Sequence, residues 1–400
     1  MNKNGPQNHH QKRYSDVPKT KQLWKDFVAL TYTKTVRRCD SVFMCILTDS
    51  GEKFEEKFGT LTPELERLRQ QLCLHHVKEV ALESTSIYWV PVWRVLESEF
   101  DVKLVNPYFI RQLPGRKTDV KDAHWIAIVL QKGLIKSSFI PDDQIQQLRH
   151  YNRKIFYLNR HLQRAEQGMD LILQRCNIRL SNYLSNIGGK SMRKVIKALS
   201  EGNHDPQQLV KLVHGRITNK HGIDCIKDSL TGIISQVDTD MLAMGFAEME
   251  FFEKQLSDCK QKLLELCRQY YCQQMDLLQT IPGIKEHSAA SIIAEVGVDM
   301  KAFLTASSLV GWAGLRPRND ESAGKIKGRK TLHGNKYLRV MLVQCAWGAS
   351  RTKSSRFCVR YNTLKKRMNH NKALIANARK ILVVIWHILE KKQPYVAIAA

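Results

Sequence analysis

An unbroken helical repeat between residues 148 and 172 constrains the fold more than any other feature of this sequence. Its apolar side chains recur at spacings of three and four: Leu148, Tyr151, Ile155, Leu158, Leu162, Ala165, Met169 and Ile172. A seven-residue period sustained over this length predicts a coiled-coil seam and not an ordinary amphipathic helix. A second such pattern contains Leu242, Phe246, Met249, Leu256, Leu263 and Tyr270. The sequence therefore predicts two long helices, each with one buried face.

Each of these helices can bury its apolar face in one of two ways. Either they pack antiparallel against each other, with the polar stretch 202–219 between them, or each mates with another copy of the chain. Long seams favour oligomers, so a homo-oligomer, dimer or tetramer, is the expected assembly.

The region before this repeat has a different periodicity. Strand-like runs alternate with helical patterns, the strands at 41–47, 53–58, 77–82 and 102–105 and the helices at 63–73, 89–100 and 119–132. This order predicts an α/β domain with helices packed on a mixed sheet. The expected boundaries are a disordered tail at 1–25, the α/β domain at 26–143, the helical region at 144–275 and a C-terminal domain at 276–400.

Two carboxylates stand three residues apart where the helix 119–132 begins. Asp119 and Asp122 share one face at that spacing, and a third acid, Glu83, ends the buried strand that starts near residue 77. Carboxylates from a strand and a helix can converge on a divalent cation such as Mg²⁺. The alternative is a solvated helix start, where Asp complements the helix dipole.

The charge of the chain indicates its partners. Lys and Arg number 63 against 38 Asp and Glu, a net charge of +25, and a polyanion such as DNA or RNA is the natural partner. No stretch approaches the roughly 20 apolar residues of a membrane-spanning helix, and the polar start of the sequence does not resemble an export signal. A cytoplasmic protein without a membrane partner is expected. Its ten cysteines contain no CxxC pair, which favours free thiols over zinc or disulfides.

The last third of the sequence has two features suited to phosphate. Residues 277–297 are expected to form helix, Pro-Gly turn and helix, a helix-hairpin-helix unit whose backbone N–H groups can contact phosphate, or which only packs. A glycine-rich basic loop follows, able to wrap a phosphate backbone. Its candidate nucleic-acid-binding residues are Arg316, Arg318, Lys325, Lys327, Arg329, Lys330, Lys336 and Arg339.

One hydroxyl lies inside this basic loop. Ser322 is flanked by cations that would stabilise the oxyanion of a serine attacking a phosphate. The alternative is a capping or solvated serine. Further along, Phe357 and Tyr361 are interleaved with bases and are candidates for stacking on nucleotides.

Several segments together resemble one protein family. They are Glu83-Ser-Thr-Ser-Ile-Tyr-Trp, Leu113-Pro-Gly-Arg-Lys-Thr-Asp-Val-Lys-Asp-Ala, Thr280-Ile-Pro-Gly-Ile, Trp312-Ala-Gly-Leu-Arg-Pro, Glu321-Ser-Ala-Gly-Lys and Gly334-Asn-Lys-Tyr-Leu-Arg. In this order they resemble the DEDD transposases of bacterial insertion sequences, the insertion sequence one-ten family. The resemblance runs from about residue 40 to 395.

The resemblance implies an architecture and an activity. It implies a RuvC-like, ribonuclease H-type N-terminal domain, a coiled-coil middle and a mainly α-helical C-terminal transposase domain. Glu83, Asp119 and Asp122 match the family's second, third and fourth acids, which use Mg²⁺, and Ser322 matches its serine nucleophile. It further implies a multimeric bacterial recombinase at the nucleoid, guided by a structured non-coding RNA and acting on donor and target DNA.

The match fails at the family's first acid. Members open the domain with a strand of the form Gly-Ile-Asp-Val-His-Lys, and here about seven residues, that Asp among them, have no counterpart before the strand at 41–47. Asp40 is the nearest carboxylate, although it aligns better with the turn after the lost strand. Alternatively residues 27–33 replace the strand, and Thr31 then takes the approximate place of the acid, where a hydroxyl is a poor substitute on Mg²⁺.

Two hypotheses for function follow. In the first, the chain is an RNA-guided transposase that cuts and rejoins DNA with Mg²⁺ and Ser322. In the second, it is a catalytically impaired relic that still binds nucleic acid.

Overall fold

The computed structural model describes residues 27–35, 38–48, 50–106, 119–135, 137–317, 320–322, 325–328, 331 and 333–396. The chain divides into two compact units, Met1–Ile140 and Pro141–Ala400. The predicted tail at 1–25 lies outside the described residues. Within those ranges, the structure has no helix that is both long enough and apolar enough to cross a membrane.

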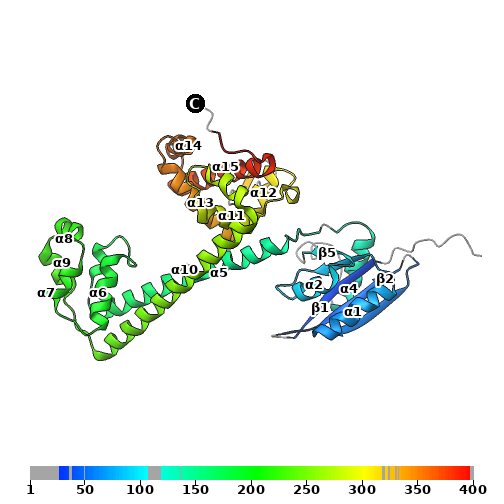
Figure 1. Cartoon of the computed structure of the whole chain (residues 1–400), viewed down its shortest axis with the longest axis horizontal. Coiled ribbons are helices and arrows are strands. Elements are labelled where there is room, and N and C mark those ends of the chain that lie inside the picture. The colour runs from blue at the N-terminus through cyan, green and yellow to red at the C-terminus, as the bar shows by residue number, and fades with distance from the viewer. Residues whose placement is uncertain are drawn as a thin grey trace, which may run out of the picture. The chain divides into compact units, whose positions relative to one another are not determined.

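The first unit is built on a five-stranded mixed sheet of order β3-β2-β1-β4-β5 (Figure 1). Its strands are β1 Phe27–Thr35, β2 Arg38–Leu47, β3 Lys53–Gly59, β4 Glu79–Glu83 and β5 Asp101–Val105. Strands β1, β2 and β3 are antiparallel, whereas β4 runs parallel to both β1 and β5. The predicted mixed sheet is confirmed.

The central strand of the sheet shows which of the two possibilities for the family's opening strand holds. No strand is lost from the sheet, because β1 pairs with β2 on one side and with β4 on the other. Residues 27–33 therefore fill the position, which was the second of the two possibilities. They do so because the run Phe27-Val-Ala-Leu is apolar and is followed by β-branched residues, which suits a strand covered on both faces.

Helices cover both faces of this sheet, because strand side chains alternate between them. Val28 and Leu30 pack on the face covered by α1 (Thr62–Leu74) and α2 (Trp89–Leu96). Ala29 points to the opposite face and packs against α4 (Asp119–Gln131). The sheet thus lies between two helical layers.

The second unit is organised around a long helical hairpin (Figure 1). Its helices are α5 (Asp143–Arg175) and α10 (Gln236–Gln279). At one end Arg175 of α5 pairs with Asp238 of α10, and at the other the Tyr271 hydroxyl donates to Asp142 Oδ1 at 3.2 Å. The two helices are therefore antiparallel and bury their predicted faces against each other within one chain.

One member of the predicted seam is wrong. Tyr270 is 48 % exposed, and the neighbouring Tyr271 is buried in its place. After Leu263 the buried positions recur every four residues, at Cys267, Tyr271 and Met275, and the backbone at Tyr271 leaves helical geometry (φ −136°, ψ 33°). The seven-residue spacing of buried positions ends at Leu263, so extending it by seven residues predicts Tyr270 and misses the buried Tyr271.

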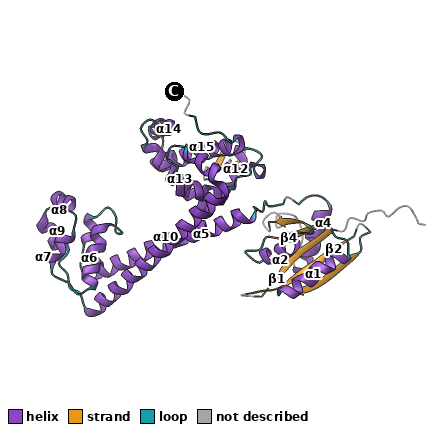
Figure 2. Ribbon diagram, viewed as in Figure 1, coloured by secondary structure: helices purple, strands orange, loops and turns teal. Residues whose placement is uncertain are grey.

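A helical lobe joins the far ends of the hairpin (Figure 2). It contains α6 (Lys190–Ser200), α7 (Pro206–Leu209), α8 (Gly215–His221) and α9 (Ile223–Ser229). The lobe has its own core, in which Met192, Val195 and Ile226 pack near Met169 of α5 and Leu242 of α10. The stretch 202–219 between the long helices therefore carries short helices.

A mainly helical C-terminal region, as predicted, packs on the end of the hairpin where α5 begins and α10 ends. Its elements are α11 Glu286–Val296, α12 Ala306–Trp312, β6 Asp320–Ser322, β7 Lys325–Gly328, α13 Lys336–Arg351, α14 Arg356–Lys365 and α15 His370–Lys391. One core joins them to α5 and α10, with Leu148 and Leu278 among its members. The C-terminal helices and this end of the hairpin therefore share their buried surface.

The turn between α10 and α11 serves packing. Gly283 has φ +88°, and a Cβ there would lie 2.4 Å from the Cys345 carbonyl oxygen, so only glycine lets the turn approach α13. Ile281 and Ile284 are buried on either side. Glu286 already places a carboxylate in the first turn of α11, paired with Arg268, which disfavours a second anion there. Phosphate contact by this turn stays a prediction.

Candidate catalytic residues and nucleic-acid interface

Glu83 ends β4 beside the central strand. Its side chain is half-buried, and its Oε1 accepts a hydrogen bond from Thr85 Oγ1 at 2.8 Å. The register of β1 with β4 pairs Leu30 with Leu82. The next residues along the two parallel strands are Thr31 and Glu83, so threonine stands beside this acid in the sheet.

Alternation assigns both positions to one face of the sheet. Ala29 and Ala81 pack on the face covered by α4. Thr31 and Glu83 each follow by two residues and so fall on that face. The side chain of Thr31 lies outside the described residues, so its contact with Glu83 stays a prediction.

Asp119 and Asp122 open α4. Helical spacing puts these positions on the same face as Ala123 and Ile126, which pack against the sheet. These two helix positions thus belong to the α4 face that packs on the sheet, and Glu83 ends a strand of that sheet. The side chains of Asp119 and Asp122 lie outside the described residues, so their convergence with Glu83 on a metal stays a prediction.

Asp40 lies away from this group. It is exposed, and it falls at a β-bulge, because the register of β1 with β2 shifts between Thr33 and Lys34. Phe43 is the β2 partner of Thr31, and Asp40 is three residues further along β2, about 10 Å at the usual strand rise. Across the described ranges, no group of three or more His, Cys, Asp or Glu is arranged to hold a metal ion.

The backbone around Ser322 forms a hairpin where the sequence predicted a loop. Ser322 ends β6 and pairs with Lys325 of β7. A bridge between Pro317 and Thr331 closes the base of the hairpin. The serine therefore ends one strand of a short β-ribbon whose other strand carries two lysines. Of the predicted phosphate-binding residues, Arg318, Arg329 and Lys330 lie outside the described residues, as do the side chains of Lys325 and Lys327.

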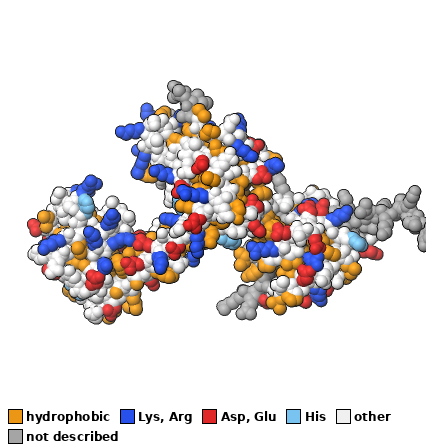
Figure 3. All heavy atoms as spheres, viewed as in Figure 1, with side chains coloured by type: hydrophobic (Ala, Val, Ile, Leu, Met, Phe, Trp, Pro, Cys, Tyr) orange, Lys and Arg blue, Asp and Glu red, His pale blue; other side chains and the backbone are white. Residues whose placement is uncertain are grey.

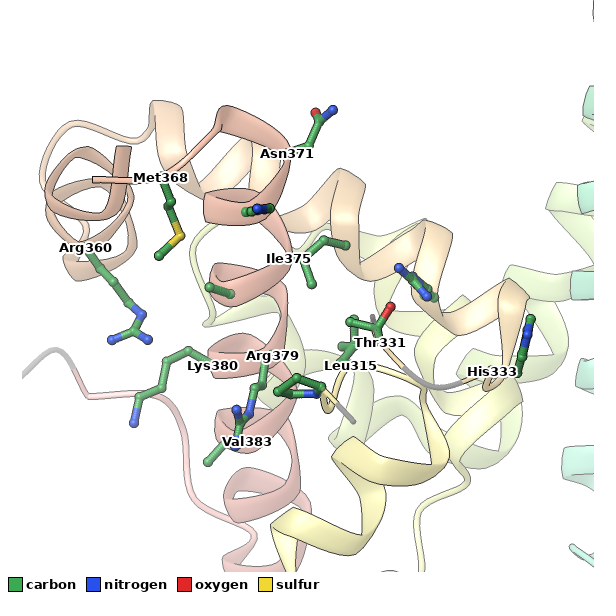
Figure 4. Close-up of a pocket in the computed structure, with 14 residues that line it drawn as sticks. Leu315, Thr331, His333, Arg360, Met368, Asn371, Ile375, Arg379, Lys380 and Val383 are labelled. Carbon is green, nitrogen blue, oxygen red and sulfur yellow. The ribbon is translucent and has the colours of Figure 1, made fainter. Parts of the chain in front are cut away.

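A cationic groove opens beside the base of this hairpin (Figure 4). Its volume is about 1280 Å³, and it extends from Leu315, Pro317 and Thr331 to α14 and α15. Its basic side chains come from three helices: Arg339, Arg360, Lys372, Arg379 and Lys380. No Asp or Glu is among the described residues that line it. Lys and Arg side chains also gather on the visible surface around α14 (Figure 3).

Sequence reasoning found Arg339 in this groove but missed its α15 wall. Lys372, Arg379 and Lys380 are spaced by seven and eight residues, which places them on one helical face. This spacing of basic residues is the sequence signal that could have identified the α15 wall. The predicted stacking residues are wrong, because Phe357 and Tyr361 are only 3 % and 7 % exposed and pack inside the C-terminal cores.

Lys336 has an unexpected environment. Its Nζ lies 5.0 Å from the ring centre of Tyr337, 5.6 Å from that of Tyr157 and 5.9 Å from that of Phe156, as in a cation–π cluster. The Tyr157 and Tyr337 hydroxyls are hydrogen-bonded at 3.0 Å. This bond and the charge of Lys336 lower the pKa of Tyr157. Lys336 remains exposed, so its predicted contact with nucleic acid is still a prediction.

A buried polar network centres on Glu295 of α11, which is 0 % exposed. Its carboxylate accepts hydrogen bonds from Arg153 Nη2 at 3.2 Å, Asn152 Nδ2 at 3.1 Å and Asn335 Nδ2 at 2.7 Å. Arg149 Nη2 also donates to the Glu295 carbonyl oxygen at 2.9 Å. Burial lowers the pKa of Arg149, whereas the charge of Glu295 raises it.

This network fixes the helix that follows the serine hairpin. Asn335 is the N-cap of α13, and its Oδ1 accepts from the backbone N–H groups of Tyr337 and Leu338 at 3.0 and 3.1 Å. The same side chain donates to Glu295. Glu295 therefore ties α5 to α11 and to the start of α13. Sequence reasoning missed it because its partners are 40 to 146 residues away in the chain.

We expect Glu295→Ala to destabilise the second unit by about 3–5 kcal/mol, because it leaves the buried Asn152 amide and the partly exposed Arg149 and Arg153 without their anion. Urea unfolding followed by circular dichroism measures this loss. Glu248→Ala, at an exposed position of α10, is the matched control and should change stability by less than about 0.5 kcal/mol. Equal stabilities for the two variants would contradict the structural role of Glu295.

Comparisons with known proteins identify two segments. Residues 275–362 match the family model described as "Transposase IS116/IS110/IS902 family". Residues 40–178 match the DEDD transposase model of the IS110 group, described as "Transposase". The first segment contains the serine hairpin and part of the groove, and the second contains the three acids.

Two curated proteins are similar over part of the chain. One is the transposase for insertion sequence element IS1111A of Coxiella burnetii, 30 % identical over 122 residues, which are 30 % of this chain and 33 % of that protein. The other is the insertion element IS900 uncharacterized 42 kDa protein of Mycobacterium paratuberculosis, 32 % identical over 124 residues, 30 % of each chain. The matched region spans about a third of each relative.

Proposed function

We propose that this chain, which belongs to the IS116/IS110/IS902 family of transposases, is a DNA recombinase that cuts and rejoins strands of an insertion sequence. The observation that carries the proposal is Ser322 on a lysine-bearing hairpin whose base opens on a cationic groove, with no Asp or Glu among the described residues of its lining. Such a surface suits a phosphate backbone, and a hydroxyl beside it suits attack on phosphorus. The relative from Coxiella burnetii bears the name of a transposase, which also supports it.

The proposed reaction is transesterification. Ser322 Oγ forms a bond to phosphorus and loses its proton, while the bond from phosphorus to one bridging oxygen breaks and that oxygen leaves as a protonated DNA end. The phosphodiester is kept as a protein–DNA linkage, so a second strand end can rejoin by the reverse step. Arg316 and the lysines of β7 would neutralise the charge that develops on the phosphate oxygens.

We further propose a ribonuclease H-type role for the first unit. A mixed sheet of order β3-β2-β1-β4-β5 with the acid-bearing β4 beside the central strand supports it. Glu83, Asp119 and Asp122 offer oxygen donors, which fit Mg²⁺ better than softer metals. When bound, the metal would polarise the scissile phosphate. The fit is incomplete, because β1 supplies Thr31 at the position beside Glu83.

The partners follow from charge and family. A net charge of +25 supports binding to both DNA and a structured guide RNA. A homo-oligomer, dimer or tetramer, remains part of the proposal, because transposition joins donor and target DNA.

The second candidate function is a catalytically impaired relic that binds nucleic acid. Thr31 in the central strand favours it, because this strand then lacks the family's first carboxylate. Both candidates predict nucleic-acid binding, so binding alone does not separate them.

A strand-exchange assay separates them. The purified chain is incubated with donor DNA, target DNA, the element's RNA and Mg²⁺, and joined products are detected by amplification across the new junction. We expect slow, Mg²⁺-dependent joining, well below that of a relative with all four acids, and none in EDTA. Full-rate joining would contradict the proposed deficit at Thr31, and no joining at any Mg²⁺ concentration would favour the relic.

A further inference from the structure

We propose that the cationic groove between the serine hairpin and α15 binds a single strand of DNA, with Arg379 and Lys380 as its principal phosphate contacts. This inference rests on the proposed function, because it assigns a substrate class to the surface beside Ser322. It adds a nucleic-acid-binding helix that the basic loop alone does not predict.

Uncompensated charge is the first argument. Within the described part of the chain, none of the five basic residues that line the groove has an ion-pair partner. By contrast, Arg153 and Arg193 elsewhere in the same unit are paired with Glu295 and Glu253. Cations held around one cavity repel each other, and a bound polyanion removes that cost.

The arrangement of these cations is the second argument. In Figure 4, Arg360 from α14 and Lys380 from α15 extend into the same space, and Arg379 also projects from α15. Lys372 lies seven residues before Arg379, about 10 Å away at the usual helical rise. The wall therefore presents charge over the length of several nucleotides and does not enclose one small anion.

The apolar floor is the third argument and favours an unpaired strand. Met368, Ile375 and Val383 line the groove between the basic residues, and Leu315 and Pro317 continue this surface towards the hairpin. Sugar and base faces can cover such a floor only when the bases are not stacked inside a duplex. Phosphates would meet the cations while the rest of each nucleotide covers the aliphatic side chains.

The position of the groove selects DNA over RNA. Pro317 and Thr331 form the bridge that closes the base of the hairpin, and both line the groove. Ser322 is five residues from Pro317 along the same ribbon. A strand in the groove therefore runs beside the ribbon that carries the proposed nucleophile, which in a transposase attacks DNA.

The test measures binding of a fluorescein-labelled 20-nucleotide single-stranded DNA to the full chain by anisotropy over a range of salt concentrations. We expect Arg379→Ala/Lys380→Ala to weaken binding at least tenfold. The slope of log affinity against log salt should fall by about 1.4, or ~0.7 for each lost phosphate contact. The matched control is Lys365→Ala/Lys366→Ala, which removes the same charge from the exposed last residue and C-cap of α14, outside the groove. We expect less than a threefold loss there, and unchanged circular dichroism for both variants.

The other outcomes would overturn the inference or separate it from the recombinase proposal. Equal losses for both double variants would mean diffuse attraction and overturn it, and so would a loss confined to RNA of the same sequence or to duplex DNA. If the protein–DNA adduct at Ser322 forms normally while the groove variant binds DNA like the parent, the inference fails and the recombinase proposal stands. If no adduct ever forms but the loss is confined to the groove variant, the groove stands and the proposed chemistry fails.

Discussion

Ser322→Ala is expected to abolish strand exchange and the denaturation-resistant protein–DNA adduct while leaving RNA and DNA binding intact. Alanine removes the only oxygen that this residue offers to phosphorus, so the covalent intermediate has no route to form. We expect a loss of at least about 10³-fold in joining rate, which corresponds to more than ~4 kcal/mol in activation free energy. Electrophoresis of labelled DNA under denaturing conditions detects the adduct.

The control for this change is Ser307→Ala. Ser307 is an exposed serine of α12 in the same C-terminal region, and its loss should leave adduct and joining unchanged. The competing nucleophile is water activated by the metal site. Cleavage that persists in Ser322→Ala, together with a parent that forms no adduct, would favour hydrolysis and overturn the serine mechanism.

The regular elements were predictable because their periodicity is local. The strands β2 to β5 alternate or form short apolar runs, and the faces of α5 and α10 repeat over many turns, so each pattern indicates its own element. The central strand was harder. Residues 27–33 satisfy strand propensity, but they do not match the family's opening motif, and the pairing with β2 and β4 that settles their place is a tertiary property.

The candidate sites were predictable only in part, for a physical reason. Ser322 and the basic loop are contiguous in sequence, and so are Asp119 and Asp122. The Glu295 network and the α15 wall of the groove bring together residues that are far apart in the chain. No local sequence pattern predicts such contacts. Phe357 and Tyr361 show the converse error, because aromatic residues among bases resemble a stacking surface until their burial is known.

Thr31→Asp is expected to raise the rate of Mg²⁺-dependent strand exchange by about 10²-fold, the effect of one well-placed metal ligand or of a group that orients such a ligand. The reason is position. Thr31 stands beside Glu83 in the parallel register of β1 with β4, on the sheet face that α4 covers, so an aspartate there adds a carboxylate to the predicted acids. Joining rates at saturating Mg²⁺ measure the effect.

A second readout does not depend on activity. Adding a fourth carboxylate to the three predicted acids should lower the unfolding temperature without metal, because like charges repel, and Mg²⁺ should then raise it more than in the parent. Thr33→Asp is the matched control, since it makes the same substitution two residues further along β1 and away from the Glu83 level. If Thr33→Asp raised the activity as much as Thr31→Asp does, the added charge and not the ligand position would be responsible.

The contrary result is equally specific. If the parent already joins DNA at the rate of a complete relative and Thr31→Asp changes nothing, another group supplies the first ligand. Asp40 is then the nearest carboxylate on β2, and Asp40→Ala would have to abolish that activity. Its place at the bulge, about 10 Å along the strand from the partner of Thr31, makes this the less favourable geometry for a shared metal. We therefore expect Asp40→Ala to leave joining within twofold in both the parent and the Thr31→Asp background.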